Sequence, residues 1–262
     1  MKKLKSFLLL CFISLTLWSC DSYNKEVGLT LEYMYANALA ELKDGDLTKA
    51  EESLQKIVSQ YPYKDEAIEA QVLLIWAYYI DNDFIEAEVT IDAFLKYYVY
   101  NEYTDWVYYM KALVDYEQME NATRDQSYTK KALDEFYDII KQHPSSVYAQ
   151  DGIFKIQIIK YNLAYRSMKI GKYYLKNKNY YAAIPRYQEI ITLYQDTAFT
   201  QEAMYRLVYI WLILGEDEEA FRVASVLGYN YSDSKWYTKS LKLLKKYSKK
   251  QIKELPSARI VK

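Results

Sequence analysis

Apolar and small residues recur along this 262-residue chain with the spacing of helices packed in pairs. In the stretch from Gly171 to Thr197, Gly171 and Ala183 stand twelve residues apart, and Tyr174 and Tyr187 follow them. Small side chains are needed where two antiparallel helices come closest, because larger ones would hold the helices apart. The stretch therefore predicts a helix hairpin of the tetratricopeptide kind, whose repeat is about 34 residues long.

The small residue of the second helix recurs five times, which predicts five hairpins: Ala50, Ala87, Ala132, Ala183 and Ala220. Proline follows the first and third of these alanines after twelve residues, at Pro62 and Pro144. Because proline cannot continue a helix, both positions predict the corner where a hairpin ends.

The third repeat is irregular. Ala112, the expected small residue of its first helix, precedes Ala132 by twenty residues, so about eight residues are inserted around Asn121 to Tyr128. Composition agrees with an all-α fold, since six Gly and four Pro leave few tight turns and 51% hydrophobic residues can fill a continuous core. We predict an α-solenoid of about five tetratricopeptide-like hairpins with a C-terminal capping helix; another all-helical bundle is the alternative.

The N-terminus has the pattern of an export signal. Three lysines precede the apolar run of residues 7–18, which is shorter than the ~20 residues that span a bilayer. The run ends in Leu17-Trp18-Ser19-Cys20, which resembles the bacterial lipobox. We therefore expect a signal peptide over 1–19, a diacylglyceryl group and an N-acyl group on Cys20, and a lipidated linker over 20–29. An ordinary secreted protein cleaved elsewhere is the alternative.

Charge is distributed unevenly along the rest of the chain. Residues 21–120 carry 7 basic and 21 acidic side chains, net −14, whereas residues 121–262 carry 24 and 14, net +10. Complementary potentials steer association, so this asymmetry favours separate partners for the two halves. Solvated faces without partners are the alternative.

The basic half ends in a predicted amphipathic helix from Lys235 to Lys253, with eight lysines and no acid. Apolar residues recur there at helical intervals, at Tyr237, Leu241, Leu244 and Tyr247. The pattern leaves three interpretations open: a cap on the last repeat, a docking surface for an acidic protein, or attraction to anionic lipid. The predicted export and the net negative charge after the signal argue against nucleic acid. Residues 254–262 have no pattern and are expected to be a flexible tail.

Catalytic chemistry finds little support. The single histidine, His143, stands directly before Pro144 as a corner residue, and the neighbouring acids Glu51 and Glu52 are expected to face solvent. We therefore predict no enzyme activity, no metal and no cofactor besides the lipid on Cys20.

Several phrases resemble the BamD family, the lipoprotein subunit of the outer-membrane barrel-assembly machinery. They are Arg-Asp-Gln at Arg124 to Gln126, HPSSVYAQD at His143 to Asp151, GKYYLKNKNYYAAIPRY at Gly171 to Tyr187 and LGYNYSDSKWY at Leu227 to Tyr237. The resemblance implies a scaffold that helps fold and insert β-barrel proteins. Residues 30–120 would receive unfolded substrate, and residues 121–253 would hold the barrel subunit BamA and join other Bam subunits.

Single residues follow from the same resemblance and from repeat geometry. Arg186 matches the position that couples this family to BamA, and Pro185 beside it departs from the family pattern. First helices line the inner surface of such repeats, which predicts an aromatic substrate-peptide groove: Tyr35, Leu39, Val72, Trp76 and Tyr79. The resemblance places the protein on the periplasmic face of the outer membrane, while Asp21 resembles a signal for retention in the inner membrane. A periplasmic tetratricopeptide lipoprotein that organises cell-wall or division proteins is the alternative function.

Overall fold

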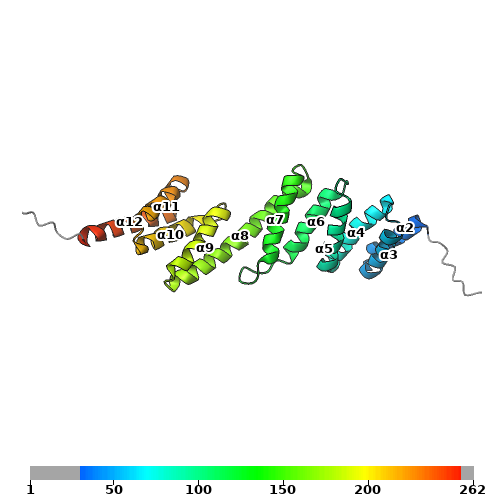
Figure 1. The fold of residues 1–262 in the computed structure, drawn as a ribbon, viewed down its shortest axis with the longest axis horizontal. Helices are drawn as coiled ribbons and strands as arrows, with labels where there is room; N and C mark the ends of the chain where they lie inside the picture. The colour runs from blue at the N-terminus through cyan, green and yellow to red at the C-terminus, as the bar shows by residue number, and fades with distance from the viewer. Residues whose placement is uncertain (1–29, 255–262) are drawn as a thin grey trace, which may run out of the picture. The chain divides into compact units, whose positions relative to one another are not determined.

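The computed structural model describes residues 30–254, and within this range it contains eleven helices and no strand (Figure 1). The predicted signal peptide, Cys20, the linker 20–29 and residues 255–262 of the predicted tail lie outside the described residues. The helices are α2 (Leu31–Asp44), α3 (Leu47–Gln60), α4 (Asp65–Asp81), α5 (Phe84–Tyr97), α6 (Thr104–Glu117), α7 (Ser127–Gln142), α8 (Val147–Lys176), α9 (Tyr180–Leu193), α10 (Thr200–Leu214), α11 (Asp217–Asn230) and α12 (Lys235–Glu254).

The predicted repeat of helix hairpins is confirmed. Consecutive helices pack in pairs, α2 with α3, α6 with α7, α8 with α9 and α10 with α11, and the short turn at Asn82 and Asp83 joins α4 to α5. All five predicted alanines of the second helices are fully buried: Ala50, Ala87, Ala132, Ala183 and Ala220. Each second helix therefore places a methyl group in the buried contact of its hairpin.

The chain divides into two compact units. The first holds α2, α3, α4 and the start of α5 as far as Thr90, and the second runs from Ile91 through α12. The division at residue 120 that the charge pattern suggests falls inside the second unit, after α6.

Turns between paired helices are short except in the third repeat. Two glycines in the left-handed region, Gly45 (φ 77°) and Gly215 (φ 81°), end α2 and α10, where a side chain would be strained. Nine residues, 118–126, separate α6 from α7. The predicted insertion is confirmed, although Ser127 and Tyr128 at its expected end already belong to α7.

The closing helix α12 packs on α10 and α11, as the capping interpretation predicts. Gly228 of α11 makes room for it, because a Cβ atom there would lie 2.6 Å from the ring of Tyr237. The packed side of α12 is centred on Ser240, which is fully buried, so Leu241 of the predicted apolar stripe is instead 38% exposed. Within residues 30–254, no helix combines the length and apolarity needed to cross a bilayer.

Candidate functional site

A cavity of about 280 Å³ opens beside Arg186 in the second unit. Its walls come from the inserted segment before α7, from α7 itself and from α8 and α9. The lining residues are Asp125, Gln126, Ser127, Lys130, Leu163, Arg166, Ser167, Arg186 and Glu189. Three cationic and two acidic side chains therefore share a small polar space.

The inserted segment forms one wall because α8 holds it by its backbone. Arg166 of α8 donates from Nη1 to the carbonyl oxygen of Ala122 at 3.1 Å and also to that of Arg124. Gln126, only 5% exposed, donates from Nε2 to three carbonyl oxygens of the segment, those of Asn121, Arg124 and Asp125, at 3.0, 3.3 and 2.8 Å. These bonds fix the path of the segment's backbone.

The other atom of that amide is unsatisfied. Gln126 Oε1 is buried and has no hydrogen-bond partner among the described residues. A buried acceptor without a donor is costly, so this oxygen is a local energetic cost in the wall of the cavity. Nearby, bonds from the side chain and backbone of Ser127 lower the pKa of Asp125, and the charge of Arg166 contributes less.

Arg186 lies on α9 with 45% of its side chain exposed. Its Nη1 atom is 3.8 Å from Glu189 Oε2, one turn further along the helix, and the same oxygen accepts a 2.7 Å hydrogen bond from the Ser167 hydroxyl. A separation of 3.8 Å is an ion pair without hydrogen-bond geometry. The guanidinium therefore keeps donors available for a carboxylate, which it can bind with two parallel bonds.

Pro185 directly precedes Arg186 inside α9. The helix begins at Tyr180, and Asn179 caps the amide of Ala182. A proline is tolerated in the first turn of a helix, but Pro185 lies beyond that turn. The carbonyl of Tyr181 consequently lacks the helical hydrogen bond that residue 185 would otherwise donate. One backbone bond is missing within a turn of the cavity.

The predicted groove residues of the first unit lie on α2 and α4, which are neighbouring first helices. Tyr35 and Leu39 are one turn apart on α2, and Val72, Trp76 and Tyr79 follow one another on α4 at helical spacing. The Tyr35 hydroxyl donates to Glu69 Oε2 at 2.7 Å, which links the two rows. Leu39 is 41% and Trp76 39% exposed, so the rows present apolar surface next to a carboxylate.

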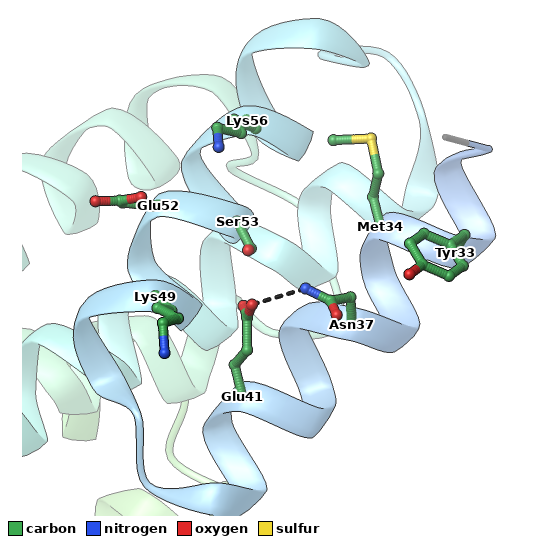
Figure 2. Close-up of a pocket in the computed structure, with 8 residues that line it drawn as sticks. All are labelled: Tyr33, Met34, Asn37, Glu41, Lys49, Glu52, Ser53 and Lys56. Atoms are coloured by element: carbon green, nitrogen blue, oxygen red, sulfur yellow. Dashed lines mark hydrogen bonds between the residues drawn. The ribbon is translucent and has the colours of Figure 1, made fainter. Parts of the chain in front are cut away.

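A second cavity, of about 260 Å³, lies between α2 and α3 in the same unit (Figure 2). Figure 2 shows Glu41 at its centre, with Oε1 accepting a 2.7 Å bond from Asn37 Nδ2. By helical geometry the α2 residues that line it face away from Tyr35 and Leu39. The cavity is therefore separate from the predicted groove.

Two further residues from the sequence take definite positions. His143 caps the C-terminal end of α7 as the predicted corner residue, 5.5 Å from the ring of Tyr108. The expectation that Glu51 faces solvent is wrong, because its Oε1 atom is buried without a partner. Burial raises the pKa of Glu51, and the negative charges of Asp81 and Asp83 add to the effect. In the described part of the chain, no three His, Cys, Asp or Glu side chains are grouped to hold a metal ion.

Sequence reasoning found Arg186 and the Arg-Asp-Gln segment but did not connect them, and it missed Arg166. Arg166 is an ordinary basic residue in a long amphipathic helix, so its contact with a segment over forty residues earlier leaves no local pattern.

Comparison of the sequence with known proteins identifies a family. The model of the YfiO family, described as "Outer membrane lipoprotein", matches residues 29–227. "Outer membrane protein assembly factor BamD" of Rickettsia prowazekii is 34% identical over 249 residues, covering 94% of this chain and 99% of the relative. The protein of the same name from Caulobacter vibrioides is 34% identical, covering 82% of this chain and 70% of that one. A solved tetratricopeptide repeat protein from Parabacteroides merdae, 15% identical, has a TM-score of 0.40 and covers 85% of this chain and 75% of that chain.

Proposed function

We propose, because the chain belongs to the YfiO family of outer membrane lipoproteins, that it is a non-catalytic scaffold of outer-membrane barrel assembly. It binds the barrel subunit BamA and unfolded β-barrel proteins and joins other Bam subunits. The relatives named above, which align along most of this chain, are assembly factors by name. The proposal extends that role to this chain.

The observation that best supports a BamA-binding site is that two separate sequence features line one cavity. The segment Arg124 to Gln126 and Arg186 are two helices apart in the chain, yet Asp125, Gln126 and Arg186 line the same space. Arg186 is 45% exposed and supplies donors for a carboxylate of the partner.

The substrate site in this proposal is the pair of rows on α2 and α4. Aromatic and aliphatic side chains there take the apolar side chains of an extended peptide, and repeat surfaces bind such peptides along their first helices. The test is the affinity for a C-terminal peptide of a barrel protein. Trp76→Ala is expected to weaken binding about tenfold or more, as loss of an aromatic anchor does. Tyr33→Ala, on the opposite face of α2, is the control; equal affinity of both variants to wild type contradicts the groove.

Attachment to the outer membrane in this proposal runs through Cys20. The sequence before Cys20 resembles a lipobox, the signal for acylation of the cysteine, and two or more acyl chains anchor a protein stably. Mass spectrometry of the N-terminal peptide tests the lipid, and fractionation of wild type beside Asp21→Ser tests sorting. Recovery of the wild type in the inner membrane, and of the variant in the outer membrane, would mean that Asp21 retains it.

The experiment that tests the main proposal is affinity purification from gently solubilised envelopes, with co-purifying proteins identified by mass. Wild type is expected to recover a BamA-like barrel protein, and Arg186→Glu is expected to lose it because the new carboxylate repels the partner's. Arg222→Glu is the matched control, since Arg222 also pairs with a glutamate one turn away on the second helix of a hairpin.

Each outcome of this purification decides one point. Recovery with wild type and Arg222→Glu but not with Arg186→Glu supports both function and site. Recovery with all three keeps the function and moves the docking surface away from Arg186. Absence of a barrel subunit with wild type contradicts the assembly role and favours the alternative scaffold for cell-wall or division proteins.

A further inference from the structure

The outward face of α12 carries a lysine stripe that neither the cavity nor the groove uses. It consists of Lys235, Lys239, Lys242 and Lys246, all of them exposed. These positions follow one another at three- or four-residue intervals, so they form one row about 16 Å long at ~1.5 Å per residue. The buried Ser240 lies on the other side of the helix, against α10 and α11.

Residues 234–253 contain no acid, and the single acid of α12, Glu254, is its last residue, eight positions after Lys246. Among the described residues, the four lysines make no ion pair, whereas Lys111, Lys160 and Lys172 in the same unit each have an acidic partner. Two of the four lie over an aromatic ring instead: the ammonium groups of Lys235 and Lys239 are 5.4 and 4.3 Å from the centre of the half-buried Trp236 ring. The stripe is thus an uncompensated positive surface with an indole at its edge.

The composition of the stripe distinguishes between possible occupants. Protein interfaces are enriched in arginine and aromatic residues and depleted of lysine, because the planar guanidinium fixes geometry and the ammonium does not. Every cation of α12 is a lysine, and its large apolar residues as far as Tyr247 are partly buried, apart from the exposed Leu241. Lipid phosphates accept hydrogen bonds from many directions and impose no fixed geometry. A row of lysines on a helix therefore matches an anionic headgroup surface better than a protein surface.

We propose that the lysine stripe of α12 binds the anionic phospholipid headgroups of a membrane surface. The stripe supplies charge attraction alone, since the apolar side of the helix is occupied by α10 and α11. This contact lies far along the sequence from Cys20 and acts independently of the acyl chains there. This proposal rests on the proposed function only because that function locates the protein at a membrane.

The test uses the chain from position 20 onward with Cys20→Ser, which carries no acyl group, in sedimentation with lipid vesicles. Vesicles of phosphatidylcholine are compared with vesicles that also contain phosphatidylglycerol. Binding is expected only to the anionic vesicles and is expected to weaken with salt, because the Debye length falls below about 10 Å above 0.1 M. Replacing all four stripe lysines with glutamine is expected to weaken binding at least about tenfold, since each lysine contributes separately.

The matched control replaces four other exposed lysines of the second unit with glutamine, Lys141, Lys169, Lys176 and Lys178, for the same change in net charge. Circular dichroism checks that both variants keep their helices. Equal loss in both variants, or equal binding to neutral vesicles, overturns the proposal. Self-association without vesicles that only the stripe variant abolishes, with vesicle binding unchanged, would assign the stripe to a second copy. Purification of the BamA-like subunit reads out the proposed function separately, so the two can fail independently.

Discussion

At the scale of single residues, the third hairpin buries an acidic pair that the sequence pattern does not reveal. Asp115 of α6 is 1% exposed, and its Oδ2 atom lies 3.1 Å from the ammonium group of Lys131. Glu135 of α7 faces it: burial raises the pKa of Glu135, and the hydrogen bond with Asp115 and the charge of Asp115 raise it further. Lys131 and Lys111 oppose this effect without cancelling it. Glu135 is therefore the member of the pair whose pKa is raised, which favours its protonated form.

This proton makes stability depend on pH. The pKa of Glu135 is raised from its ordinary value of 4.5 to about 9 in the folded chain. The stability associated with the protonated carboxyl group is therefore complete below pH 4.5 and is lost as pH rises from there through the folded-state pKa. Thermal unfolding is expected to show a melting temperature that falls with rising pH in this window. Glu135→Gln keeps the donor without the titration, so the slope is expected to flatten.

Asp134→Asn, an exposed acid on the same helix, is the control and is expected to keep the slope of wild type. Parallel curves for wild type and Glu135→Gln would mean that another group carries the pH dependence. Sequence reasoning could not anticipate this pair, because its members stand twenty residues apart and only the packing of α6 on α7 joins them.

At the scale of elements, the sequence predicted the hairpins well because each needs a small residue at a fixed place. The same steric rule explains the contact of α8 with α9. A Cβ atom at Gly171 would lie 2.7 Å from Cε1 of Tyr187, whose side chain is fully buried and has no room to move. The repeat pattern did not predict the 30-residue length of α8, because it marked only the small residue Gly171 near the end of that helix.

Gly171→Ala is therefore expected to destabilise the chain by about 1–3 kcal/mol, the usual cost of overpacking. This cost exceeds the gain of about 1 kcal/mol that alanine brings to a helix interior. Gly152→Ala on the same helix is the control, because its Cβ would lie 3.3 Å from Phe136 Cδ1, where a small shift suffices. Denaturant unfolding of both variants measures the difference, and equal stabilities would refute the steric account.

At the scale of the whole molecule, the charge pattern and the packing divide the chain at different places. Charge changes sign near residue 120, whereas the compact units meet near residue 90, inside α5. Charge can be counted along a sequence, but the boundary of a unit depends on which helices share buried contacts. The site predictions follow the same rule: Arg186 stood out by its sequence context, whereas the cavity around it needed the fold.

The division into two units also predicts which helices unfold locally when one unit is destabilised. In a hairpin array each repeat is stabilised by its immediate neighbours, so a cavity made in one unit acts mainly on that unit. Leu54 of α3 is fully buried in the first unit and Leu207 of α10 is 1% exposed in the second, and replacing either with alanine is expected to cost about 2–5 kcal/mol. Amide hydrogen exchange is expected to quicken in α2 to α4 for Leu54→Ala and in α8 to α11 for Leu207→Ala. Because both variants lose the same atoms at similar burial, each is the other's control, and equal acceleration along residues 30–254 in either variant would show that the units unfold as one.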